Sequence, residues 1–218
     1  TFSKYSGMRN HMGLTGAQAA ERVLHGAGIY DVRIERVAGN LTDHYDPRNK
    51  VLRLSDATYG QCSVAAVGVA AHECGHAIQH ARGYAPLQFR SALVPVANFG
   101  SMIAWPLIVL GLFINSQSSA LLINIGILAF SLAVLFQLVT LPVEYNASGR
   151  AVRILAETGM MQGEEIVATK KVLNAAALTY VASAAAAILQ LVRILILTGG
   201  RRLSQLMNEN WCLGFCWK

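Results

Sequence analysis

The chain has 218 residues, enough for one or two domains, and 54% of them are hydrophobic while only 14% are charged. This composition excludes an ordinary charge-rich soluble protein and predicts segments that cross a membrane. Although the net charge is +6, the basic residues form no runs interleaved with aromatic side chains. We therefore expect no nucleic-acid partner and interpret the charge as a signal of membrane topology.

Residues 1–93 are predicted to form an α/β domain. After a capping box at residues 15–18 and a first helical run over 19–24, apolar and polar residues alternate over 31–37, which is typical of a half-exposed strand. Residues 50–54 are interpreted as a second strand that pairs back on the first as a hairpin. A long helix is predicted over 61–80, after this sheet.

The helix predicted over 61–80 carries His72, Glu73 and His76 in an H-E-x-x-H motif. Residues four apart share a helix face, with Cβ atoms roughly 5–6 Å apart, so both imidazoles can bind one Zn²⁺ from the same side. Glu73 then lies beside the metal, placed to take a proton from a water that zinc activates. Small apolar residues precede the motif, and polar residues buried there are costly unless a metal is their partner.

Three hydrophobic segments follow the predicted zinc domain. Residues 94–114 contain no charge over 21 residues, and residues 120–143 contain none over 24, so each is long enough to cross a hydrocarbon core ~30 Å thick. Only 115–119 separates them, and we expect a transmembrane helical hairpin. The third segment, 175–190, is shorter and rich in alanine. Two interpretations of it stay open, a third span and a re-entrant or core element.

A catalytic zinc site needs three protein ligands and leaves one position for water, so a third ligand is required. Two crossings return the chain to its starting side, and the first charged residue there is Glu144, where the second span ends. Topology therefore favours Glu144. His80 lies one turn beyond His76, ~6 Å further along the helix axis, which disfavours it as a ligand of the same ion. His44, in a segment rich in turn-forming residues, is the other alternative.

The remaining cysteines and the end of the chain give weaker signals. Cys62 and Cys74 are expected to behave as small apolar side chains. Cys212 and Cys216 lie in an atypical tail, interpreted as a disulfide-closed loop, an interfacial anchor or an artificial extension. The expected division of the chain is a zinc-binding α/β domain at 1–93, a transmembrane hairpin at 94–143, a cytoplasmic helical segment with the third ligand at 144–174, the third hydrophobic segment at 175–200 and the tail at 203–218.

The order of an α/β domain, H-E-x-x-H, two spans and Glu-x-x-Ala resembles the HtpX and CAAX-prenyl-protease type of membrane gluzincin. It is more similar to the YugP-like family of neutral zinc membrane metallopeptidases. The segments that carry this resemblance are 41–47, 69–80, 90–98, 143–148 and 173–180. The resemblance implies an α+β zincin-like metalloprotease domain combined with a helical transmembrane bundle, mainly α. It also implies that His72, His76 and Glu144 bind Zn²⁺ and that Glu73 is the general base. In the HtpX-type relatives an Asp four positions after the third ligand supports a zinc histidine, whereas this chain has Ser148.

The distribution of arginines predicts the orientation in the membrane. The loop 115–119 has no Lys or Arg, whereas Arg82, Arg90, Arg150 and Arg153 flank the two clear spans. By the positive-inside rule we expect an integral protein of the bacterial plasma membrane whose zinc domain faces the cytoplasm. The two arginines after the third segment fit this topology only if that segment is re-entrant. Members of the family usually begin with a transmembrane helix, and this chain starts where such a helix would end.

The predicted function is hydrolysis of peptide bonds in membrane-associated or misfolded proteins, so the expected partners are a protein or peptide substrate and the lipid bilayer. The donor for the oxyanion stays open among Arg150, Tyr145 and His44. The strand at 50–54 is expected to bind an extended substrate by edge addition. An intramembrane protease is disfavoured because polar residues separate the motif from the first span. A catalytically silent zinc-stabilised scaffold or chaperone-like protein is disfavoured by the intact Glu73.

Overall fold

The structure is a computed structural model that describes residues 1–114 and 118–214, with the side chains of residue 118 and of residues 200–214 outside the description. The chain forms two compact units. The first unit comprises Thr1–Arg90 and Val139–Val181, and the second comprises Ser91–Leu138 and Ala182–Lys218. A predominantly helical chain with a small sheet and three long apolar helices confirms the expected fold class. The side chains expected to pair in the tail, Cys212 and Cys216, lie outside the described residues.

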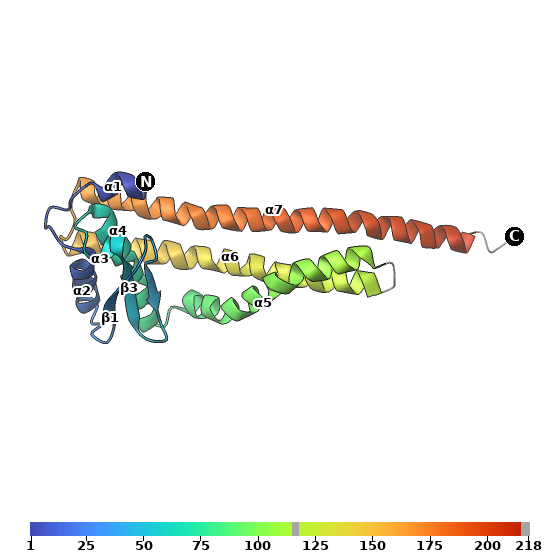
Figure 1. Cartoon of the computed structure of the whole chain (residues 1–218), viewed down its shortest axis with the longest axis horizontal. Helices are drawn as coiled ribbons and strands as arrows, with labels where there is room; N and C mark the ends of the chain where they lie inside the picture. The colour runs from blue at the N-terminus through green and yellow to red at the C-terminus, as the bar shows by residue number, and fades with distance from the viewer. Residues whose placement is uncertain (115–117, 215–218) are drawn as a thin grey trace. The chain divides into compact units, whose positions relative to one another are not determined.

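The first unit holds the sheet and all of the short helices (Figure 1). Its elements are α1 (Phe2–Ser6), α2 (Gly16–Gly26), β1 (Arg33–Val37), β2 (His44–Asp46), β3 (Val51–Ser55), α3 (Asp56–Tyr59) and α4 (Val64–Ala81). The long helices α5 (Ala85–Phe113), α6 (Ser118–Glu157) and α7 (Glu164–Gly214) contribute the parts that fall within its bounds.

The sheet has the order β1-β3-β2, with β1 parallel and β2 antiparallel to the central β3. The predicted hairpin between residues 31–37 and 50–54 is therefore wrong. The hairpin is formed by β2 and β3, and Asp46 closes its turn by accepting hydrogen bonds from the backbone N–H groups of Arg48 and Asn49 at 3.0 and 3.3 Å. The expectation of edge addition at β3 is also wrong, because both of its edges are already paired.

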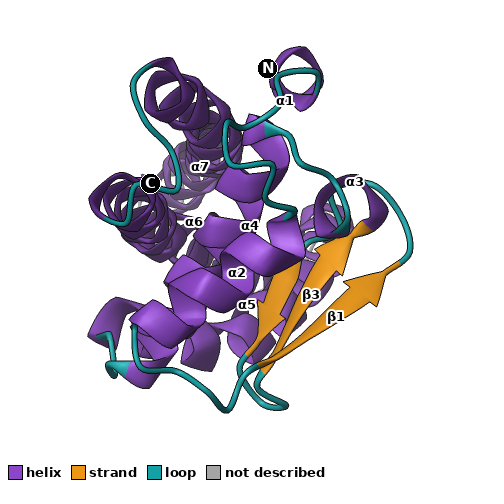
Figure 2. Cartoon of the chain, turned by 90° about the vertical axis from the view of Figure 1, so that its left-hand side faces the viewer, coloured by secondary structure: helices purple, strands orange, loops and turns teal. Residues whose placement is uncertain are grey.

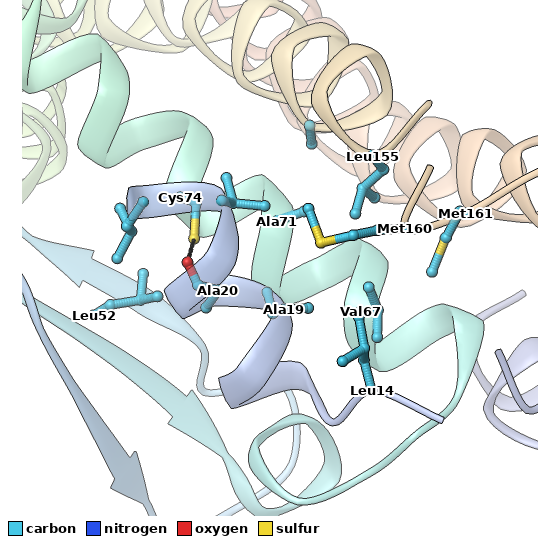
Figure 3. Close-up of a cluster of buried hydrophobic side chains, with 14 of the residues drawn as sticks. Leu14, Ala19, Ala20, Leu52, Val67, Ala71, Cys74, Leu155, Met160 and Met161 are labelled. Atoms are coloured by element: carbon cyan, nitrogen blue, oxygen red, sulfur yellow. Dashed lines mark hydrogen bonds between the residues drawn. The ribbon is translucent and has the colours of Figure 1, made fainter. Parts of the chain in front are cut away.

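The core of the first unit lies where α2 and α4 cover one face of the sheet (Figure 2). Cys74 is fully buried there, and its Sγ lies 3.6 Å from the carbonyl oxygen of Ala20 on α2 (Figure 3). Leu155 and Met161 bring the end of α6 and the loop after it into the same cluster. Cys74 is thus a core residue that holds α4 in place. The motif histidines lie on the other face of this helix.

The bounds of α4 follow from its flanking residues. Ser63 caps its N-terminus, since its Oγ accepts a hydrogen bond from the backbone N–H of Ala66 at 3.1 Å. Beyond Ala81 the chain turns at Gly83, whose φ of +61° is a left-handed conformation that favours glycine. The helix therefore carries the whole H-E-x-x-H motif within regular backbone.

In the second unit, α5 and α6 approach each other through small residues. A Cβ added to Gly100 would lie 2.8 Å from the carbonyl oxygen of Ala129, and one added to Gly126 would lie 3.0 Å from that of Ala104. Ser119 Oγ donates a hydrogen bond to the carbonyl oxygen of Gly111 at 2.6 Å. Close approach through small residues is typical of helix pairs in membranes, where packing replaces the hydrophobic effect as the cause of association.

Three helices are long and apolar enough to cross a membrane, by length and composition: Ala85–Phe113, Ser119–Glu157 and Glu164–Gly199. Within α7 the helix continues without a break through the third hydrophobic segment. A re-entrant element needs a turn inside the membrane, and the described part of α7 has none, so the structure favours the spanning alternative for this segment.

Candidate metal centre

The structure brings His72 and His76 on α4 together with Glu144 on α6, all in the first unit. One ligand atom of each residue lies within 4.8 Å of the others, and theirs is the one group of this kind among the described residues. Glu144 Oε2 lies 3.3 Å from His72 Nε2 and 3.6 Å from His76 Nε2. The Glu144 side chain is 3% exposed, so the carboxylate meets the two imidazoles away from bulk water.

Gly75, inside the motif, allows α4 and α6 to approach at this point. A Cβ at Gly75 would lie 2.7 Å from the carbonyl oxygen of Ala147, which is closer than side-chain carbons come to backbone. Ala147 is three residues after Glu144 on α6. The small residue between the two histidines is therefore what lets the carboxylate reach them.

The orientation of His76 is fixed by the buried amide of Gln79, which is 0% exposed. Gln79 Nε2 donates to the carbonyl oxygen of Val143 at 2.9 Å and to Asn146 Oδ1 at 3.0 Å. Its Oε1 must then be the atom that faces His76 Nδ1, at 3.0 Å. Because Oε1 can only accept, Nδ1 carries the proton and Nε2 keeps a free lone pair that points toward Glu144.

The Asn146 amide in this network cannot turn round, because Arg150 Nε donates to the same Oδ1 at 2.7 Å. The guanidinium of Arg150 also lies 5.9 Å from the centroid of the Tyr84 ring. Arg150 is therefore engaged away from the metal-ligand group, and it supports the Gln79 network from the outside.

His72 has its own partner, since its Nδ1 lies 3.0 Å from Ser148 Oγ on α6. Ser148 stands where HtpX-type relatives have an Asp, and its hydroxyl contacts the histidine ring even without a carboxylate. A neutral hydroxyl is a weaker acceptor than a carboxylate, so it holds the ring less strongly than an Asp would. Each histidine is thus held through Nδ1 and presents Nε2.

The other oxygen of Glu144 faces a cation. Glu144 Oε1 lies 3.7 Å from a terminal nitrogen of Arg90, whose Nε is buried and has no hydrogen-bond partner among the described residues. This contact leaves Oε2 to the histidines, an arrangement that suits a carboxylate binding a metal through one oxygen. Burial alone would lower the pKa of His76. The neighbouring carboxylates of Glu144 and Glu73 have the larger effect, so the pKa of His76 lies above its usual value.

The donor set and spacing fit zinc. Ligand atoms at ~2.0–2.1 Å from a tetrahedral Zn²⁺ lie about 3.3 Å from each other. The Nε2–Oε2 separations of 3.3 and 3.6 Å match that value. Two imidazoles and one carboxylate are also a known ligand set of catalytic zinc, with a fourth position left for water or substrate.

A cavity of about 450 Å³ opens beside these residues, wholly within the first unit. His72, Glu73 and Glu144 line one part of it, and Tyr180 on α7 lines it as well. Glu73 is half-buried and makes no hydrogen bond or ion pair among the described residues, so its carboxylate is free to accept a proton. Tyr180 lies close enough to Glu144 to interact with it.

The alternative candidates lie elsewhere. His80 Nδ1 is 2.9 Å from the Tyr45 hydroxyl, and His44 Nδ1 is 2.9 Å from the carbonyl oxygen of Thr42. Neither belongs to the metal-ligand group. Tyr145, the remaining oxyanion candidate, is 48% exposed and lines a different cavity. None of the three proposed oxyanion donors therefore lines the cavity beside Glu73.

Sequence reasoning missed three residues of the site, Gln79, Arg90 and Tyr180, and identified the position of Ser148 only through the family resemblance. Gln79 alone carried a local signal, because it lies three residues after His76 and so on the same helix face. Arg90 and Tyr180 approach from α5 and α7, and no spacing within a single helix indicates such contacts.

Comparisons with known proteins identify the family of this chain. The family described as "Putative neutral zinc metallopeptidase" matches residues 1–199. The chain is 47% identical over 201 residues to a Bacillus subtilis (strain 168) protein described as "Putative membrane protease YugP", covering 92% of this chain and 88% of that protein. No solved structure matches. The chain therefore belongs to the neutral zinc metallopeptidase family, as its resemblance to YugP-like proteins predicted.

Proposed function

We propose that this protein is a membrane-embedded, zinc-dependent endopeptidase that hydrolyses peptide bonds of membrane-associated or misfolded proteins. The observation that carries the proposal is the convergence of His72 Nε2, His76 Nε2 and Glu144 Oε2 beside a free Glu73 carboxylate, in a cavity of about 450 Å³. Membership of a zinc metallopeptidase family and three apolar helices support it.

In this proposal His72, His76 and Glu144 hold the zinc ion. When bound, the ion supplies Lewis-acid polarisation of a peptide carbonyl and makes water more acidic. Glu73 accepts the proton of the attacking water on its carboxylate and delivers that proton to the departing amine. Glu73 suits this role because, among the described residues, no partner holds its carboxylate.

The proposal also assigns the donor for the developing oxyanion. Tyr180 lines the cavity together with Glu73 and Glu144, whereas Arg150 is bound to Asn146. A phenolic O–H that donates to the carbonyl oxygen as charge develops is worth ~10²–10³ in kcat for comparable donors. Tyr180→Phe should therefore lower kcat by that order, while the zinc dissociation constant stays within a factor of two.

The zinc domain is proposed to face the cytoplasm of a bacterial cell, on the basis of the arginine distribution about the first two spans. An uninterrupted third span leaves the arginines after it on the opposite side. Membrane-impermeant labelling of single cysteines introduced at Lys171 and at residue 117 tests the orientation. The proposal requires the cysteine at residue 117 to react from outside intact cells and the cysteine at Lys171 to react only from the cytoplasmic side.

The test of the catalytic proposal is Glu73→Gln, which removes the base and leaves the ligands in place. Purified wild type with one zinc per chain should cleave an unfolded protein such as casein, and the variant should keep its zinc and lose at least ~100-fold in kcat. Wild type that binds zinc but shows no cleavage of any unfolded or membrane protein substrate, with Glu73→Gln indistinguishable in cells, would instead establish the silent scaffold.

A further inference from the structure

A second cavity of about 500 Å³ lies between α6 and α7 in the first unit. We call it the α6–α7 groove. Its lining comes from these two helices alone: Tyr145, Ser148, Gly149, Val152, Arg153 and Ala156 on α6, and Ile166, Lys170, Leu173 and Asn174 on α7. The α6 residues follow a spacing of three and four, so the groove runs along one face of that helix.

Small residues on α6 create the space. A Cβ added to Gly149 would meet no atom within 4 Å, so this position leaves the groove open. Leu173, 3% exposed, forms its apolar floor, and the buried Ser148, 8% exposed, lies at its edge. Ser148 and Leu173 also line the cavity beside Glu73, so the two cavities adjoin at these residues.

The groove is positively charged. Arg153 and Lys170 line it from facing helices, and none of the acidic residues that the structure describes does. Within the described part of the chain, neither cation has an ion pair or a hydrogen bond from its side chain. Asn174 and Tyr145 add an amide and a phenol, which can donate hydrogen bonds to an anion. The groove therefore offers two unpaired cations above an apolar floor.

The end of the groove at Tyr145, Lys170 and Asn174 lies where membrane headgroups are expected. Both helices continue from it into uncharged apolar segments, 120–143 on α6 and 175–190 on α7. Lys170 is five residues before Ala175, which is roughly 7.5 Å along a helix axis. The headgroup layer on each side of a bilayer is about 5–7.5 Å thick. Tyr145 lies just past the end of the α6 segment, where interfacial aromatic residues are frequent.

We propose that the α6–α7 groove binds the headgroup of an anionic phospholipid. Arg153 and Lys170 contact the phosphate, and the glycerol end lies toward Tyr145 and Asn174. The apolar floor and the position at the ends of two spans favour a lipid over a free anion, because a free anion gains no binding energy from contact with apolar surface. Basic pockets between transmembrane helices on the cytoplasmic side are a recurring form of lipid recognition. The inference does not depend on zinc or on proteolysis.

The test is the affinity of the full chain for dihexanoyl phosphatidylglycerol below its micellar concentration, measured by native mass spectrometry in a neutral detergent. The variants are Lys170→Gln, Arg153→Gln and, as a matched control, Lys171→Gln. Lys171 is exposed, is adjacent to Lys170 in α7 and does not line the groove. Dihexanoyl phosphatidylcholine and inorganic phosphate are measured in the same way on the wild type.

We expect each groove variant to weaken phosphatidylglycerol binding about fivefold, and Lys171→Gln to change it less than twofold. Phosphatidylcholine should bind the wild type at least tenfold more weakly. An equal loss in Lys171→Gln would show diffuse attraction to the basic surface and overturn the site. Inorganic phosphate binding as tightly as the lipid would overturn the lipid as occupant and leave a free-anion site. Because Lys170 and Lys171 are both exposed, loss of folding does not obscure their comparison.

Discussion

Replacing Gln79 by Met tests whether His76 is held in place through its Nδ1. Met has a similar volume and no hydrogen-bonding amide, so the change removes the contacts of Gln79 with His76, Val143 and Asn146 without leaving a large cavity. His76 loses the acceptor that fixes its tautomer and ring position. The amide is fully buried, so the partners left behind cannot turn to bulk water.

The expected magnitude has two parts. Loss of a residue that orients a metal ligand typically weakens metal affinity ~10–100-fold. Leaving a buried polar group without a partner costs ~1–3 kcal/mol, and this loss affects the apo protein as well. Gln79→Met should therefore raise the zinc dissociation constant by at least tenfold and lower the thermal stability of both the apo and the zinc-bound protein.

The zinc dissociation constant is measured by competition with a chelator of known affinity, and apo stability by thermal unfolding in detergent. Gln61→Met is the control, because Gln61 is exposed and its side chain makes no hydrogen bond among the described residues. A folded Gln79→Met variant whose zinc dissociation constant is within threefold of wild type would refute the role given to this amide.

Three further results are expected. Gly75→Ala should lower the melting temperature, because its Cβ would lie 2.7 Å from the Ala147 carbonyl oxygen. Gly149→Ala should raise or preserve the melting temperature, because no atom lies within 4 Å of the Cβ that it adds. Burial raises the pKa of Tyr45 to about 12, so ultraviolet titration should show a tyrosinate step there that Tyr45→Phe lacks. Because unfolded tyrosine ionises first, stability should fall as pH rises from ~10 toward that value. Cys74 should resist thiol reagents in the folded protein and react only after denaturation, because burial raises the pKa of its thiol and excludes the reagent. Comparable reactivity in the folded and denatured protein would contradict its core position.

The buried position of Cys74 also changes which experiments can locate the motif relative to the membrane. Its thiol faces Ala20 inside the protein core. Low reactivity of Cys74 therefore does not distinguish an intramembrane site from a buried site in a water-exposed domain. Cys62, which is half-exposed, is a better reporter of that difference.

The parts of the fold that depend on local pattern were predictable from the sequence. The capped helix α2, the motif helix α4 and the long apolar helices each carry their signal within one segment. The sheet was not predictable in the same way, because β2 has only three residues and lies in a segment rich in turn formers. A strand this short shows no detectable alternation of apolar and polar residues. Without β2 as the hairpin partner of β3, the parallel pairing of β1 with β3 could not be predicted.

The candidate site shows the same division between local and distant signals. The register of His72 and His76 is a property of one helix, and Glu144 was inferred from counting membrane crossings. The contacts that orient these residues depend on which side chains of other helices approach them. Arg90 and Tyr180 are examples, because neither lies near the motif in sequence and each is identified only when α5 and α7 are placed around it.

The central claim is that His72, His76 and Glu144 hold one zinc ion beside a catalytic Glu73. The most direct test is the zinc content of purified wild type, Glu144→Ala and Glu73→Gln by elemental analysis at equal free zinc. The account predicts one zinc per chain in the wild type and in Glu73→Gln, and little or none in Glu144→Ala. Full zinc content in a folded Glu144→Ala protein would contradict it, because the carboxylate that meets both histidines would then not be a ligand.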